Sequence, residues 1–135
     1  MLCNALGFEG QTEYRALWYL ADRLTESGFA VLRFDYHGCG DSAGSDFDPN
    51  RVDAWVRSTN GAIDALRARA GVRDVQLVGL RFGAALAYLA ARRRTDVSGL
   101  AMWWPALSGR AYARTVELII FDRVFDRGVC TPARG

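Results

Sequence analysis

The chain has 135 residues, of which 50% are hydrophobic and 24% are charged, with a formal net charge of +2 at pH 7. The apolar content excludes a disordered chain, and the length suits one domain. No long uncharged apolar run occurs, which excludes a membrane-spanning helix, so we expect a soluble, cytoplasmic protein. The small net charge predicts no nucleic-acid-binding face. Three cysteines without paired spacing and a single histidine predict neither disulfides nor a metal site.

Short apolar runs alternate with stretches of helical periodicity. The runs that predict strands are residues 1–3, 29–34, 75–78 and 97–102. Helices are predicted over a face from Tyr14 to Leu24 that stops at Gly28, and over residues 50–70, 82–94 and 110–121. The alternation predicts the α/β class, with a mostly parallel sheet covered on both faces in a three-layer α/β/α arrangement.

Residues 1–121 carry this pattern, and we predict one domain over them. Residues 122–135 contain neither a strand-like run nor a clear amphipathic stripe, and we interpret them as an atypical C-terminal tail.

A strand-to-helix turn is predicted at Gly79-Leu80-Arg81-Phe82-Gly83. An apolar strand runs into this Gly-x-x-x-Gly segment and directly on into an alanine-rich helix. Small residues two positions either side of the centre are typical of a sharp elbow whose backbone is tightly packed. In a hydrolase the central residue is a serine, but here it is Arg81, which cannot form an acyl-enzyme.

Two further loops follow predicted strands. Asp35, Gly38, Gly40 and Ser42 form an Asp-x-x-Gly-x-Gly-x-Ser loop, in which the glycines permit positive φ and the aspartate can accept hydrogen bonds from backbone N–H groups. The segment 3–8 follows the first strand, and its backbone N–H groups could face the elbow and help to bind an oxyanion.

Together the three motifs resemble the N-terminal half of an α/β-hydrolase of the serine aminopeptidase-like or lysophospholipase-like kind, over about residues 1–118. The Gly-Leu-Arg-x-Gly-Ala version of the elbow, with the segment 103–112, is similar to the hydrolase-like proteins that accompany bacterial exosortase systems. The resemblance implies a partial α/β-hydrolase fold with strand order 2-1-3-4. It also implies a ligand crevice between the first and third strands.

The resemblance further implies that Phe82 N–H and an N–H near Leu6 or Gly7 are the oxyanion donors. The reaction that it implies is hydrolysis of an ester, thioester or amide, and it implies no cofactor. The sequence departs from the family at the nucleophile position, which holds Arg81. The family's acid and histidine come from later strands, and His37 lies where the family often has arginine. No catalytic triad is predicted in this sequence.

Several residues have two interpretations. Arg81 binds an anionic group at a helix N-terminus, or it reaches solvent or pairs with a carboxylate. Ser108 is a substitute nucleophile or a helix-cap residue, and the pair at positions 103 and 104 stacks on a ligand or packs at the core and rim. His37 anchors its loop or acts as a ligand, and Cys39 lies in a turn between glycines.

Three hypotheses of function follow. The first is a truncated hydrolase, whose missing half would supply the acid and the histidine for a small ester or acyl substrate. The second is a non-catalytic pseudoenzyme that binds an anionic ligand at Arg81. The third is an inactive fragment whose unpaired sheet edge favours self-association.

Overall fold

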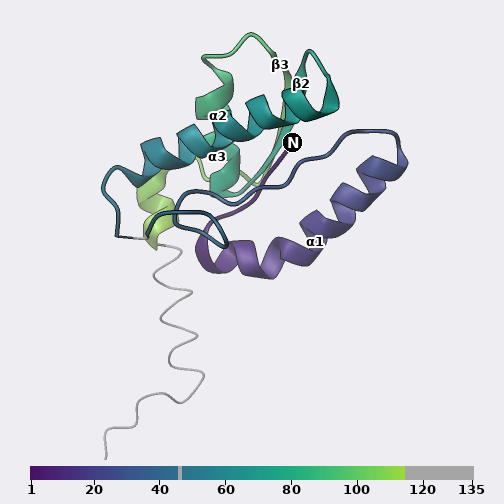
Figure 1. Cartoon of the computed structure of the whole chain (residues 1–135). Helices are drawn as coiled ribbons and strands as arrows, with labels where there is room; N and C mark the ends of the chain where they lie inside the picture. Colours follow the sequence, from purple (N-terminus) through teal and green to yellow (C-terminus); the bar gives the residue numbers. More distant parts are fainter. Residues whose placement is uncertain (46, 115–135) are drawn as a thin grey trace, which may run out of the picture. The chain divides into compact units, whose positions relative to one another are not determined.

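The computed structural model describes residues 1–45 and 47–114 (Figure 1). By its contacts the chain divides into two units, residues 1–105 and 106–135. The elements of the first unit, in chain order, are β1 (Leu2–Cys3), α1 (Gly7–Glu26), α2 (Arg51–Ala70), β2 (Val75–Leu80), α3 (Phe82–Ala91) and β3 (Val97–Trp103). In the second unit, residues 109–114 are helical.

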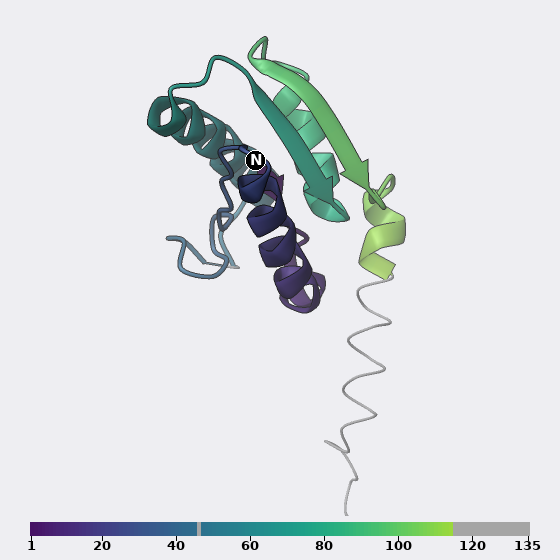
Figure 2. The ribbon, with the colours of Figure 1, turned by 90° about the vertical axis from the view of Figure 1, so that its right-hand side faces the viewer.

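The strands form a three-stranded parallel sheet in the order β1-β2-β3. Leu2 pairs with Val78 between the first two strands, and the register from Gln76↔Gly99 onward joins β2 to β3. Figure 2 shows β2 and β3 side by side and running in the same direction. The parallel sheet with intervening helices confirms the α/β class.

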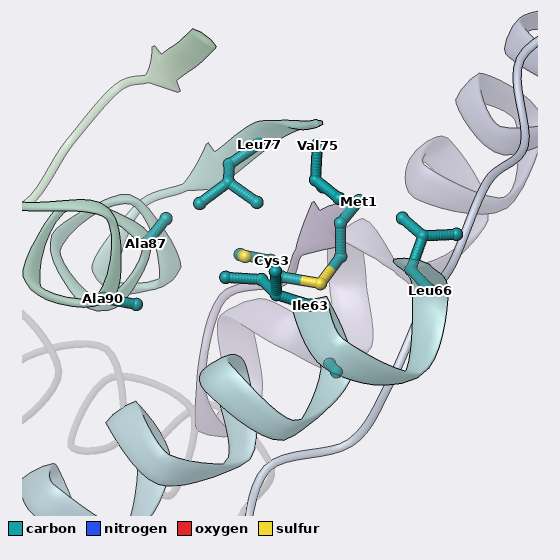
Figure 3. Close-up of a cluster of buried hydrophobic side chains, with 9 residues drawn as sticks. Met1, Cys3, Ile63, Leu66, Val75, Leu77, Ala87 and Ala90 are labelled. Carbon is teal, nitrogen blue, oxygen red and sulfur yellow. The ribbon is translucent and has the colours of Figure 1, made fainter. Parts of the chain in front are cut away.

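Helices cover both faces of the sheet, because successive residues of a strand point to opposite faces. On one face the side chains of β1 and β2 pack against α2 and α3 (Figure 3), in a cluster made of Met1, Cys3, Ala62, Ile63, Leu66, Val75, Leu77, Ala87 and Ala90. On the other face, Leu2 and Leu80 pack against Leu17 of α1. The structure is therefore three-layered, as predicted.

The predicted strand over residues 29–34 is wrong. Only Arg33 in this segment has a strand-like partner, through an isolated parallel bridge to Leu2. The reason is that β1 has only two residues, so the segment 29–34 can pair with it at one position only. At that position Leu2 N–H donates to Leu32 O at 3.0 Å. The three strands that form correspond to the predicted first, third and fourth, so the predicted four-strand order 2-1-3-4 is not confirmed.

The helices differ from prediction mainly at their ends. The first begins at Gly7, well before the predicted start at Tyr14. The third ends at Ala91 rather than near Arg94, because the N–H groups of Arg93 and Arg94 donate to carbonyls three residues back, at 3.4 and 2.9 Å, and no longer follow the α-helical spacing of four. Of the predicted helix 110–121, only residues up to 114 lie in the described part, and the predicted tail 122–135 lies outside it. No helix of the described part is long and apolar enough to cross a membrane.

Candidate functional site

Arg81 lies at the turn between β2 and α3, as the N-cap residue of that helix. Its backbone has φ 53° and ψ −120°, a region in which a residue with a Cβ is strained by about 1–3 kcal/mol. Such strain persists only where the surrounding structure imposes it. The chain therefore keeps the sharp elbow although its central residue is an arginine.

The glycines on either side make the close packing of the elbow possible. A Cβ on Gly79 would collide with the backbone of Ala84 in α3. A Cβ on Gly83 would collide with the carbonyl oxygens of Cys3 and Asn4, in the loop after β1. The turn and that loop thus lie against each other, with backbone in contact with backbone.

The side chain of Arg81 pairs with Glu9 in the first turns of α1. Both Nε and Nη2 donate to Glu9 Oε1, at 3.0 and 2.8 Å. The pair is mostly buried, since the side chains of Arg81 and Glu9 are 21% and 12% exposed. The Arg81 guanidinium also lies 5.7 Å from the ring centre of Trp104. Of the two interpretations of Arg81, pairing with a carboxylate is the one observed.

A second carboxyl group, Glu13, lies one turn further along α1. The pKa of Glu13 is raised by burial and by the neighbouring Glu9 carboxylate, and Arg81 opposes the rise. Glu9 Oε2 and Glu13 Oε2 are buried without a hydrogen-bond partner among residues 1–45 and 47–114. Sequence reasoning missed both residues, although their spacing of four places them on one side of a helix.

The loop with the predicted Asp-x-x-Gly-x-Gly-x-Ser motif closes on itself. Ser42 Oγ donates to Asp35 O at 2.7 Å, and Gly38 N–H donates to Ala43 O at 3.0 Å. Gly38 and Gly40 have φ of 71° and 53°, and a Cβ on Gly40 would collide with the Asp35 carboxylate. These contacts give the motif a structural basis.

His37 joins this loop to its neighbours. Its Nε2 lies 2.8 Å from Asp48 Oδ2, and its backbone N–H donates to Ser58 Oγ at 3.1 Å. Trp55 Nε1 donates to His37 O at 3.0 Å. A hydrogen bond from Ser45 N–H and the contact with His37 lower the pKa of Asp48. The loop-anchoring interpretation of His37 agrees with these contacts.

The residues predicted as oxyanion donors lie at two helix starts. Leu6 is the N-cap residue of α1, Gly7 is its first residue, and Phe82 is the first residue of α3. The contact of Gly83 with the loop after β1 brings these two segments close together. The role of their N–H groups as donors to a ligand stays a prediction.

The remaining candidates divide among several roles. Trp103 and Trp104 are 60% and 75% exposed at the end of β3, which agrees with the rim and not with the core. Stacking of this pair on a ligand stays a prediction. In the second unit, Ser108 Oγ accepts a hydrogen bond from Ala111 N–H at 3.3 Å, which is the expected helix cap. Cys39 is half-buried. The buried Cys3 has its pKa raised to about 12 by burial, so its thiol is protonated.

Comparison with protein families decides the lineage. The family model described as "Serine aminopeptidase, S33" matches residues 10–128, which is most of the chain and includes the elbow. The chain belongs to this α/β-hydrolase family. A search of curated protein sequences finds no match.

Membership makes the elbow of this serine aminopeptidase family member unusual. The position at the centre of the elbow, where a serine hydrolase has its nucleophile, holds an arginine bonded to Glu9. The single histidine of the sequence is paired with Asp48. Leu6 lies outside the matched residues, so the match itself adds nothing about that donor. The similarity to exosortase-associated hydrolases stays a prediction.

Proposed function

We propose that this member of the serine aminopeptidase family acts by binding rather than by hydrolysis, as a pseudoenzyme. The observation that carries the proposal is the ion pair between Arg81 and Glu9 at the elbow. A guanidinium stays protonated at any pH at which the protein is folded, so it supplies neither a nucleophile nor a general base. An acyl-enzyme at this position is therefore excluded by its chemistry.

The surroundings of Arg81 argue against the anion-binding variant of this proposal. An anion arriving at the guanidinium would have to displace Glu9, which already accepts two hydrogen bonds from it. It would also approach the Glu13 carboxyl group. Like charges at close range oppose such binding. Arg81 thus has a structural role in the proposal: it joins the elbow to α1, and a ligand binds elsewhere.

The experiment is a hydrolysis assay with the purified chain. The substrates are p-nitrophenyl acetate, p-nitrophenyl butyrate and a set of aminoacyl p-nitroanilides, and the reference is the same protein after heat denaturation. We expect equal rates before and after denaturation. A rate that requires the folded protein would overturn the proposal if it also falls in the Ser108→Ala or Ser42→Ala variant, since these serines are the alternative nucleophiles nearest to the family motifs in sequence.

A fluorophosphonate probe gives an independent readout. The probe labels activated serines covalently, and the proposal predicts no labelling of the folded chain above that of the denatured chain. Labelling of one serine in the folded chain alone would contradict it.

A further inference from the structure

A cavity of about 250 Å³ lies beside β1, and none of the elbow residues 79–83 lines it. Three segments form it: the end of β1 with the residue that follows, one side of α1, and the extended segment 33–35. The lining residues are Leu2, Asn4, Gly10, Tyr14, Leu17, Arg33, Phe34 and Asp35. This volume is below the ~300–1,000 Å³ of sites for drug-sized ligands, so a smaller molecule fits.

The cavity contains a cation, Arg33, that has no anionic partner in the described part of the chain. The guanidinium of Arg33 stacks over the ring of Tyr14, 4.4 Å from its centre. It makes no hydrogen bond or ion pair with any residue of 1–45 and 47–114, whereas Arg81 and Arg94 are both paired with carboxylates. Arginine has five N–H donors in a planar fork that suits a carboxylate. Arg33 is thus held in place by Tyr14 while its donors remain available.

Asn4 and Asp35, which both carry side-chain oxygen acceptors, line the same cavity. Asn4 Oδ1 is buried and has no hydrogen-bond partner within the described part of the chain. The Asn4 backbone is fixed by Tyr36 Oη, which donates to Asn4 O at 3.2 Å. Asp35 follows Arg33 by two residues, and both line the cavity. The two do not form an ion pair with each other.

We propose that this cavity binds a small zwitterion that carries a carboxylate and an ammonium group, such as an α-amino acid. The carboxylate pairs with Arg33, and the ammonium group donates to Asp35 and to Asn4 Oδ1. Leu2 and Leu17 supply the apolar wall for an aliphatic side chain. The ligand thereby satisfies a buried acceptor, which would otherwise be destabilising. This inference rests on the proposed function, because it supplies a ligand site outside the elbow. The hydrolysis assay and the binding titration have separate readouts, so either proposal can fail without the other.

The test is a titration of the ¹⁵N-labelled protein followed by NMR, with L-leucine as the probe. Two analogues remove one charge each: 4-methylpentanoate lacks the ammonium group, and 3-methylbutylamine lacks the carboxylate. We expect L-leucine to shift the amide signals of Asn4 and Gly10 and the Nε–Hε signal of Arg33. Each analogue should bind at least about tenfold more weakly than L-leucine, since each loses one charge-assisted contact. Equal affinity of all three compounds would overturn the proposal, as would the absence of shifts at these residues.

Variants separate the cavity from the general surface. Arg33→Gln should weaken L-leucine binding by about tenfold or more, while Arg57→Gln, which removes an exposed arginine on α2, should leave it unchanged. Asp35→Asn keeps a side-chain oxygen that can accept a hydrogen bond within the loop. This variant should weaken the binding of L-leucine more than that of 4-methylpentanoate, which has no ammonium group. Retained leucine affinity in Arg33→Gln would contradict the proposal. The comparison of the three compounds uses the unaltered protein, so it decides the matter even if a variant does not fold.

Discussion

Replacing Arg81 with methionine tests the ion pair at the elbow. Methionine keeps a Cβ and a long apolar stem, so the backbone strain at φ 53° is retained and only the charge and its hydrogen bonds are lost. In the native protein the Glu9 side chain is only 12% exposed, and the variant removes its partner while Glu13 still lies one turn away. The loss should therefore come from an unpaired buried charge.

The size of the loss follows from the burial of the pair. Removing one partner of a fully buried pair costs about 3–5 kcal/mol. Arg81 is 21% exposed, so water reaches part of the pair, and we expect a loss of about 2–3 kcal/mol in the free energy of unfolding. In urea, with a slope of about 2 kcal/mol per M, the midpoint should fall by roughly 1–1.5 M.

The assay is urea unfolding followed by far-UV circular dichroism. The control is Arg23→Met, which breaks a pair with Glu26 in which both side chains are 64% exposed, and its effect should stay below about 1 kcal/mol. The double variant Arg81→Met/Glu9→Gln should recover part of the lost stability, because it removes the unpaired charge as well. A loss in Arg81→Met no larger than in Arg23→Met would contradict a buried ion pair at the elbow.

Three other predictions concern the elbow and the sheet end. Gly83→Ala should lower the free energy of unfolding by more than about 2 kcal/mol, because its Cβ meets backbone carbonyls. Gly61→Ala, with no described atom within 4 Å of the new Cβ, should stabilise α2 by up to about 1 kcal/mol. Urea unfolding compares the two variants, and equal effects would contradict the close packing at Gly83. Arg81→Gly should be more stable than Arg81→Ala by about 1 kcal/mol, since glycine relieves the strained φ, and the reverse order in thermal unfolding would count against an elbow. Hydrogen bonds from Arg94 lower the pKa of Asp96 to about 2. The ion pair therefore stabilises the fold above about pH 4, and this contribution is lost as the pH falls through about 2. The difference in the free energy of unfolding between the wild type and Asp96→Asn should shrink over that range, and a constant difference would exclude the pair as its source.

The class of the fold could be predicted because it depends on local patterns. Val75 and Leu77 alternate with residues of the opposite face, and Gly79 and Gly83 flank a turn that only small residues allow. The segment 29–34 reads as a strand for the same local reasons, yet whether it becomes one depends on the two-residue length of β1, a partner remote in sequence. A local pattern of residues does not show which distant segments pair with each other.

The candidate site was predictable in its backbone and not in its side chains. The spacing of the glycines placed Arg81 at the elbow, but nothing local to it pointed to Glu9, which is 72 residues away in sequence. The cavity around Arg33 was missed for the same reason, since Tyr14 and Asn4 reach it from two other segments. Contacts across such separations arise only when the sheet and α1 have come together.

The most direct test of the account is an NMR measurement of the Arg81 side chain. We expect a resolved Nε–Hε signal that exchanges slowly with water and shifts in the Glu9→Gln variant, while Glu26→Gln leaves it unchanged. Such a result places the arginine of the elbow on Glu9 in solution. An Arg81 signal that exchanges as fast as those of exposed arginines, and is insensitive to Glu9→Gln, would contradict the account.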